Sequence, residues 1–319
     1  MSRPPKLTDH QKEQLKILEP ALRNAVKLGQ YQQAKKVTSK IQKLLRPTGH
    51  ETRLMKSKNW LFEAAMEAGE LNKAESGFIG IRKKMNKRTR IYLEATALLA
   101  VCYLRKDSID KAEPLMEEVL QNKHVIRSDR TRKQFKLNVI QRFEEEAALA
   151  NLRNQGAESL DVDEVQNEAG TLVQSSTTDE ELYRRLGHSL PKSVSHQILR
   201  IEKFAQKKLP AHEFKFLPDP QEKIQDEEVG KTVFSSLKRV IWRSLCDKES
   251  DIYKAWYNNG MAMVLDKKYL TTVIVTSISG MGIGIKALAV SAAALVIKLG
   301  IEVYCDRYKP AGIMDARVN

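Results

Sequence analysis

Residues 68–74 read AGELNKA, and two other stretches share their pattern: LGQYQQA at residues 28–34 and KDSIDKA at residues 106–112. Each places a turn-forming residue five positions before an alanine, which gives the pairs Gly29 and Ala34, Gly69 and Ala74, and Asp107 and Ala112. The three alanines are 40 and 38 residues apart. A glycine at such a point ends a helix, and a small alanine lets the next helix pack closely. The spacing therefore predicts helical hairpins across residues 8–150.

This pattern resembles the tetratricopeptide repeat (TPR) family, whose units have a glycine at the turn between two helices and an alanine five positions later. The matching residues are Gly29, Ala34, Trp60, Gly69, Ala74, Ala100, Tyr103 and Ala112. The units depart from the family by running four to six residues longer than its usual ~34 residues. The resemblance implies a TPR-like array of stacked hairpins. An ordinary antiparallel helical bundle is the alternative.

Composition divides the chain into three parts. We expect a TPR-like repeat domain in residues 1–153, closed by a helix over about 128–153. Residues 154–181 hold eight acidic and no basic residues, so we expect an acidic flexible linker there. Apolar residues recur at helical spacing beyond it, which predicts a C-terminal helical domain in residues 182–319. The expected fold is all-α: a TPR-like helical hairpin array followed by this helical domain.

Positive charge is concentrated in the first part of the chain. The net charge is +14, and residues 1–150 hold 31 Lys and Arg against 18 Asp and Glu. Two clusters at comparable points of successive repeats form a predicted partner-binding basic patch: Arg82, Lys83, Lys84, Lys87, Arg88, Arg90, Arg127, Arg130, Arg132, Lys133 and Lys136. Such a patch favours a protein partner with an acidic surface, or a nucleic-acid backbone as the alternative. A solvated charged edge without a partner has the same composition.

The stretch SISGMGIGIKALAVSAAALVIK at residues 277–298 has three readings. We expect an apolar helical hairpin over 269–305, packed in the C-terminal domain, with its bend at Gly280, Gly282, Gly284 and Lys286. A membrane hairpin through residues 269–297 is the alternative, because 17 uncharged residues precede Lys286. A phosphate-binding loop is disfavoured, because the glycine spacing is neither that of a dinucleotide fold nor that of a Walker A loop.

No motif of metal-binding or nucleophilic catalysis is present among the histidines and cysteines. We therefore expect no metal, no cofactor and no enzymatic activity. Cys102, Cys246 and Cys305 lie far apart in the sequence, which predicts free thiols in a reducing, cytoplasmic environment.

The expected function is that of a non-enzymatic scaffold, adaptor or regulatory subunit, which binds a protein partner through the basic TPR-like face. One alternative is a membrane-acting effector whose C-terminal hairpin inserts into the bilayer, with the protein then membrane-associated. The other is a nucleic-acid-binding accessory protein.

Overall fold

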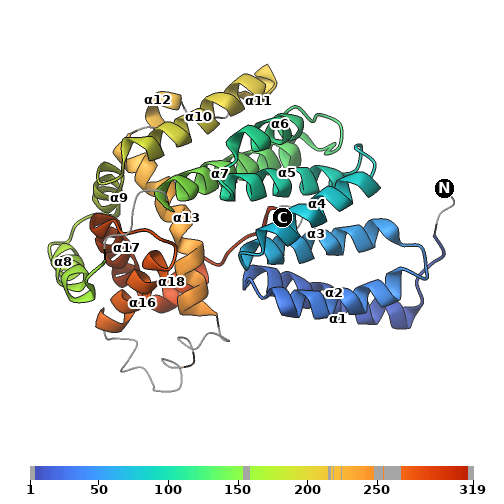
Figure 1. Ribbon diagram of the computed structural model, residues 1–319, viewed down its shortest axis with the longest axis horizontal. Coiled ribbons are helices and arrows are strands. Elements are labelled where there is room, and N and C mark those ends of the chain that lie inside the picture. The colour runs from blue at the N-terminus through green and yellow to red at the C-terminus, as the bar shows by residue number, and fades with distance from the viewer. Residues whose placement is uncertain are drawn as a thin grey trace. The chain divides into compact units, whose positions relative to one another are not determined.

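A computed structural model describes residues 4–153, 159–214, 217, 219–223, 225–247, 254 and 267–314. All regular secondary structure in these ranges is helical, which confirms the all-α fold (Figure 1). The chain forms two compact units. The first unit contains Met1–Val139 and Ala311–Asn319, and the second contains Ile140–Pro310. The division therefore falls inside a helix, α7, rather than at residue 153, where the composition changes.

The first unit is a stack of helical hairpins. Its helices are α1 (Asp9–Lys27), α2 (Tyr31–Leu45), α3 (Glu51–Glu67), α4 (Leu71–Lys84), α5 (Arg90–Arg105), α6 (Ile109–Leu120) and the first part of α7 (Asp129–Arg153). From α1 to α6, each helix packs against the next, and α3 also packs against both α1 and α5. Each hairpin therefore contacts the first helix of the next hairpin through both of its own helices.

The three hairpin turns have the same backbone geometry. Gly29, Gly69 and Asp107 lie in the left-handed region, with φ values of 67°, 81° and 53°. In each turn the N–H of this residue donates to the carbonyl three residues earlier, and the next N–H donates to the carbonyl five residues earlier. These bonds satisfy carbonyls that the ending helix leaves without partners. Membership of the TPR family stays a prediction, because a hairpin turn of this kind is not unique to one family.

The other repeat-defining residues lie at close helix contacts. Four alanines are fully buried: Ala34, Ala74, Ala100 and Ala112. Trp60 is buried beneath the cationic groups of Arg23 and Lys56. The Tyr103 hydroxyl donates to a carboxylate oxygen of Glu75 on α4, at 3.1 Å. The sequence pattern thus identified residues that join adjacent helices.

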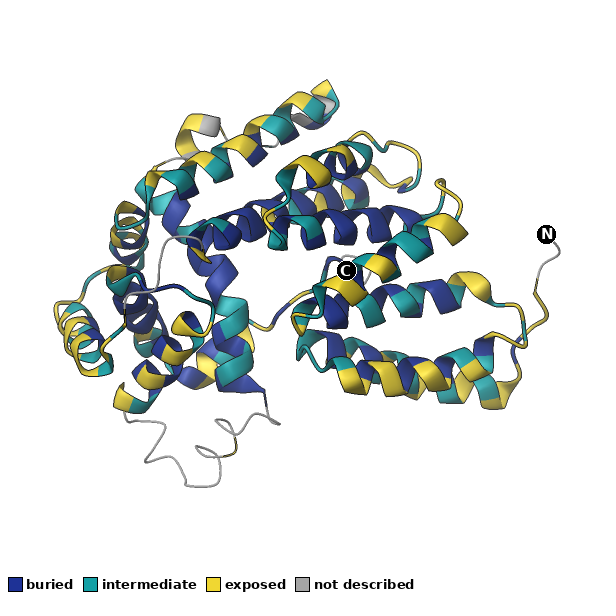
Figure 2. Cartoon of the chain, in the orientation of Figure 1, coloured by how far each residue is buried: buried dark blue, intermediate teal, exposed yellow. Residues whose placement is uncertain are grey.

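α5 is the central helix of the first unit, with 13 of its 16 residues buried (Figure 2). Two polar contacts tie α3 to α5. Asn59 Nδ2 donates to the carbonyl of Ile91 at 3.0 Å, and Arg105 pairs with Glu67 at 2.6 Å. Buried polar groups are costly without partners, so these contacts define how α3 lies on α5.

The second unit contains the rest of α7 and the remaining helices. These are α8 (Val162–Gln174), α9 (Asp179–His188), α10 (Lys192–Lys208), α11 (Ala211–Phe214), α12 (Pro220–Lys223), α13 (Asp226–Cys246), α16 (Lys267–Ser279), α17 (Lys286–Leu299) and α18 (Ile301–Arg307). α9 crosses α13 at two glycines. A Cβ atom on Gly187 would lie 1.8 Å from the Asp226 carbonyl, and one on Gly230 would lie 1.9 Å from the Tyr183 carbonyl. Glycine is therefore required at both positions for this backbone approach.

The expectation of a flexible linker is wrong for residues 162–174, because they form α8, which packs on α16 and α17. Val165 and Ala169, four residues apart, are the buried residues of this helix. Asp161 caps its first turn by accepting the Glu164 N–H at 3.0 Å. The acidic composition concealed a short amphipathic helix. Residues 154–158 of the predicted linker lie outside the described residues.

The apolar segment forms a packed hairpin of α16 and α17. The chain turns between them at residues 280–285, where Gly282 adopts a φ of 76°. Nine of the 14 residues of α17 are buried, and the helix contacts α8, α9, α16 and α18. In the described part of the chain no single helix has the length and hydrophobicity for a membrane span. α17 and α18 pass that test only as a pair, which is bent by 97°.

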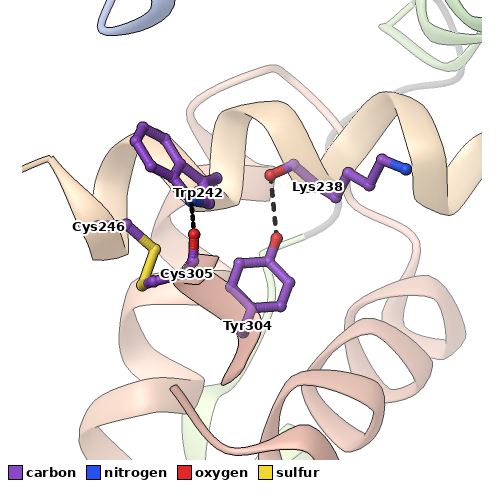
Figure 3. Close-up of a disulfide and its surroundings, with 5 residues drawn as sticks. All are labelled: Lys238, Trp242, Cys246, Tyr304 and Cys305. Atoms are coloured by element: carbon purple, nitrogen blue, oxygen red, sulfur yellow. Dashed lines mark hydrogen bonds between the residues drawn. A yellow bond between two sulfur atoms is a disulfide. The ribbon is translucent and has the colours of Figure 1, made fainter. Parts of the chain in front are cut away.

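The expectation of free thiols is wrong for two of the three cysteines. Cys246 at the end of α13 and Cys305 on α18 form a disulfide, with their Cα atoms 5.5 Å apart (Figure 3). Trp242 Nε1 donates to the Cys305 carbonyl at 2.8 Å, and the Tyr304 hydroxyl donates to the Lys238 carbonyl at 2.9 Å. α13 and α18 therefore lie together although the cysteines are 59 positions apart. The bridge removes the support that cysteine spacing gave to a cytoplasmic location.

We predict that Ala74→Leu lowers the free energy of unfolding by ~1–3 kcal/mol, because the added atoms overfill a fully buried contact. Thermal and urea unfolding measure the change. Ser76→Leu, at an exposed position of the same helix, is the matched control and should stay close to wild type. An unchanged midpoint for Ala74→Leu would contradict the packing described for α4.

We predict that replacing Cys246 and Cys305 together by serine lowers the free energy of unfolding by about 4 kcal/mol. The reason is that the bridge closes a loop of about 60 residues in the unfolded chain. Urea unfolding of the oxidised protein and the double variant measures this difference. Adding a reductant should lower the stability of wild type but leave the double variant unchanged, and equal responses would show that the bridge does not form.

Candidate functional site

Four cations of the predicted basic patch are exposed at the connection between α4 and α5. They are Lys83, Lys84, Lys87 and Arg88, and we call them the basic face. Lys83 and Lys84 end α4, and Lys87 and Arg88 lie on the loop that follows. This loop has a definite shape, because Asn86 Oδ1 accepts the Arg88 N–H at 2.8 Å and Thr89 caps α5. Among the residues that the structure describes, no carboxylate forms an ion pair with these four side chains. Their charges are therefore available at the surface.

The two cations that flank the basic face have partners inside the fold. Arg82 donates to the Tyr92 hydroxyl at 3.0 Å and to Glu118 on α6 at 2.7 Å. Arg90 pairs at 3.0 Å with Glu94, whose side chain is fully buried. Both arginines belong to the predicted patch, and both join elements of the first unit. Their type and spacing resemble those of the basic face, so the sequence alone did not separate them.

The second predicted cluster divides in the same way. Arg127 and Arg130 are exposed, whereas Lys133 is half-buried. Arg132 is buried, and it donates to the Ile126 carbonyl at 3.0 Å and pairs with Asp129 at 2.5 Å. Lys136 is buried as well. The structure therefore keeps only the outer members of this cluster as surface charges.

Two further cations were missed by the sequence reasoning. The pKa of Lys58 is lowered from its ordinary value, first by burial and then by the positive charge of Lys84, with Arg46 acting in the same direction. Glu51 opposes these effects. Arg46 and Lys84 are thus each close enough to Lys58 to repel its positive charge. Arg46 could have been found from the sequence, because it precedes α3 as the basic face precedes α5.

The lysine at the bend of the apolar hairpin is not free. Lys286 Nζ pairs with Glu164 at 2.8 Å and with Glu168 at 2.7 Å, and hydrogen bonds to these carboxylates raise the pKa of Lys286. Lys268 on α16 likewise pairs with Asp163 at 2.7 Å. Acidic residues of α8 therefore neutralise lysines of the hairpin within the second unit.

A cleft of about 450 Å³ lies between α8, α9 and α17 of the second unit. Its lining is Glu168, Thr171, Leu172, Arg185, His188, Ser189, Ala287, Val290 and Ser291. Its polar groups have partners in the fold: Ser189 Oγ donates to the Leu186 carbonyl at 2.7 Å, and His188 Nδ1 lies 3.0 Å from Asp226. No convergent set of groups marks a reaction there.

A buried ion-pair network joins α7 to α13 in the second unit. Glu145 accepts hydrogen bonds from Ser235 Oγ, at 2.6 Å, and from Arg239. Arg239 also pairs with Glu146 at 3.3 Å, and Arg142 pairs with Glu146 at 2.9 Å. Burial alone would raise the pKa of Glu145. The charges of Arg239 and Arg142, with the Ser235 hydrogen bond, outweigh burial and lower the pKa.

Within the described ranges, no group of three or more histidine, cysteine or acidic side chains is placed to hold a metal ion. Comparison of the chain with protein-family models, with curated proteins and with solved structures finds no match in any of the three. The functional argument therefore depends on the surfaces themselves.

We predict that Glu145→Gln destabilises the protein by about 3 kcal/mol at pH 7, because it leaves buried arginine charge without its full counter-charge. The folded-state pKa of Glu145 lies below its ordinary value of 4.5. The carboxylate therefore stabilises the fold above that pH, and this contribution is lost as the pH falls through the folded-state pKa. Urea unfolding at pH 7 and pH 4 should show the difference from wild type shrinking at the lower pH.

The matched control for this variant is Glu181→Gln, which weakens an exposed pair with Arg184 on α9. We expect it to change stability by less than about 1 kcal/mol. Equal effects of the two variants would contradict a stabilising role for the buried network.

Proposed function

We propose that this protein is a non-enzymatic scaffold, adaptor or regulatory subunit that binds a protein partner with an acidic surface through the basic face. The observation that supports this proposal is the set of four exposed cations, without ion-pair partners among the described residues, at the end of α4 and on the loop that leads to the next hairpin. A surface of this kind attracts acidic partners and speeds their association.

The topology of the first unit extends this surface. Successive helices of hairpins run in opposite directions, so the loops before α3, α5 and α7 lie at the same end of the stack. Arg46, Arg127, and Lys87 and Arg88 of the basic face occupy these loops, and Lys83 and Lys84 end α4 beside them. Burial is the main cause of the lowered pKa of Lys58, and the positive charges of Lys84 and Arg46 add to it. An acidic partner that brings carboxylates close to these cations offsets their repulsion of Lys58.

A protein partner fits the surface better than a single-stranded nucleic acid does. Proteins that bind single strands combine cations with exposed aromatic rings on which bases stack. The aromatic side chains nearest in sequence to the basic face, Phe78 and Tyr92, are both buried. The Tyr92 ring contacts the guanidinium of Arg82 within the fold instead.

A membrane-acting role through residues 269–297 is the second candidate. It is supported by the apolar character of α17 and α18, which together reach the composition of a span. Insertion requires α17 to leave its contacts with α8, α9 and α16. We place it second because the burial of α17 accounts for the same apolar residues.

We predict that changing Lys83, Lys84, Lys87 and Arg88 together to Glu weakens binding of a fluorescent poly-glutamate peptide at least tenfold, with the fold retained. The control variant changes Lys35, Lys36, Lys40 and Lys43, four exposed lysines of α2, and carries the same change in net charge. Binding is measured by fluorescence anisotropy at several salt concentrations, and helicity by circular dichroism.

Equal weakening by both variants would contradict a localised site, because it would show a general effect of net charge. Preference for duplex or single-stranded DNA over the peptide, with a steep salt dependence, would favour the nucleic-acid alternative. Sedimentation of the wild-type protein with phosphatidylserine vesicles, unchanged in the charge variant, would favour the membrane alternative.

A further inference from the structure

The last described residues of the chain lie within the first unit, although more than a hundred residues of the second unit precede them. Ile313 and Met314 are buried, with exposed fractions of 7% and 1%. Two large apolar side chains of a short segment are thus removed from water. Ile313 lies against Glu63, which is 250 positions earlier in the sequence.

A buried hydrogen bond fastens this segment to α3. The Ile313 N–H donates to Glu63 Oε1 at 3.1 Å, in a buried environment. The Glu63 side chain is itself buried, with an exposed fraction of 3%. A main-chain N–H that donates to a buried carboxylate is a charge-assisted hydrogen bond, one of the stronger kinds in proteins.

The residue before Ile313 is a glycine, and a larger residue there would require the Glu63 carboxylate to shift. A Cβ atom on Gly312 would lie 2.7 Å from Glu63 Oε1 and 3.1 Å from its carboxyl carbon. The carboxylate therefore recognises a main chain that approaches closely. Recognition combines three features: a small residue, a main-chain N–H, and two successive apolar side chains that are buried.

Glu63 belongs to a polar column on α3 with residues spaced four apart, which places Asn59, Glu63 and Glu67 on one side of the helix. Asn59 and Glu67 contact α5, through the Ile91 carbonyl and Arg105. Glu63, between them, contacts the segment 311–314. Two residues of the column thus contact α5, and the residue between them contacts the C-terminal segment.

We propose that the surface of α3 around Glu63 is a peptide-binding site, which residues 311–314 occupy in the isolated chain. The occupant that competes for it is a peptide of another protein with the same chemistry: a small residue followed by two large apolar residues, without an acidic side chain against Glu63. The tethered segment has a high effective concentration, so it excludes weak competitors until it is displaced. This site is independent of the basic face.

The contact is suited to exchange. Its described part is a short segment with two buried side chains and a main-chain hydrogen bond to Glu63, whereas the hairpins themselves are joined along whole helices. Specificity resides mainly in the buried apolar side chains, because a main-chain N–H is present in every residue except proline.

We predict that the full chain with Ile313→Asp binds a labelled peptide of residues 308–319 at least ten times more tightly than the wild-type chain does. The aspartate places a charge in a buried position and next to Glu63, so the tethered segment leaves and the site opens. Fluorescence anisotropy measures binding. Val303→Asp, at an exposed apolar position of α18, is the matched control and should bind as weakly as wild type.

A peptide that carries the same Ile→Asp change should not bind to any of these chains. Binding of equal strength to wild type and to Ile313→Asp, or no binding to a folded Ile313→Asp chain, would overturn the proposal. Circular dichroism establishes that the variant is folded. The Ile313→Asp chain with the four charges of the basic face reversed should still bind the peptide, so that failure of either proposal is distinguished from failure of the other.

A second chain keeps the proposal testable if Ile313→Asp does not fold. A specific protease site is inserted between Pro310 and Ala311, and the folded protein is then cut. The released segment should exchange with the labelled peptide while helicity is retained. A segment that does not exchange, or an array that melts upon cleavage, would show that residues 311–314 are an integral part of the fold and would overturn the proposal.

Discussion

The first unit depends on one structural constraint, the tight turn that a left-handed residue makes before a buried alanine. At Gly69 the turn satisfies carbonyls of the ending α3, and five positions later Ala74 lets α4 approach. Repetition of this unit directs every second loop to the same end of the stack. The basic face lies at one of those loops and on the last residues of the helix before it, so its position follows from turn geometry and not from the charged residues themselves.

The second unit is held together by different means. Gly187 and Gly230 allow α9 and α13 to touch through their backbones, and the bridge at Cys246 fastens α18 to the far end of α13. α13 also carries Arg239, the partner of buried carboxylates on α7. One long helix thus receives a backbone contact, a covalent bond and an ion-pair network. Such contacts between distant residues cost loop-closure entropy, which the burial of apolar surface must offset.

The sequence predicted what depends on local pattern. Hairpin turns, helix-forming stretches and the bend near Gly282 are encoded within a few residues, and the structure contains them. Contacts across long separations were not predicted, as the disulfide and the Glu63 contact to Ile313 show. α8 was missed for another reason. Its average composition is acidic and polar, which suggested a linker, whereas its folding depends on one apolar face formed by Val165 and Ala169, four residues apart.

Charge type alone also did not distinguish structural from available cations. Arg82 and Arg132 resemble Lys83 and Arg130 in the sequence, yet the first two have acceptors within the fold. The difference arises because Arg82 and Arg132 reach acceptors within the fold, whereas Lys83 and Arg130 are exposed and keep their hydration. The exposed cations of the basic face are thereby held close together at the end of α4 and on the loop before α5. Like charges held together there raise the free energy of the isolated protein, and an acidic surface that approaches them lowers it, which is the physical basis for binding at the basic face.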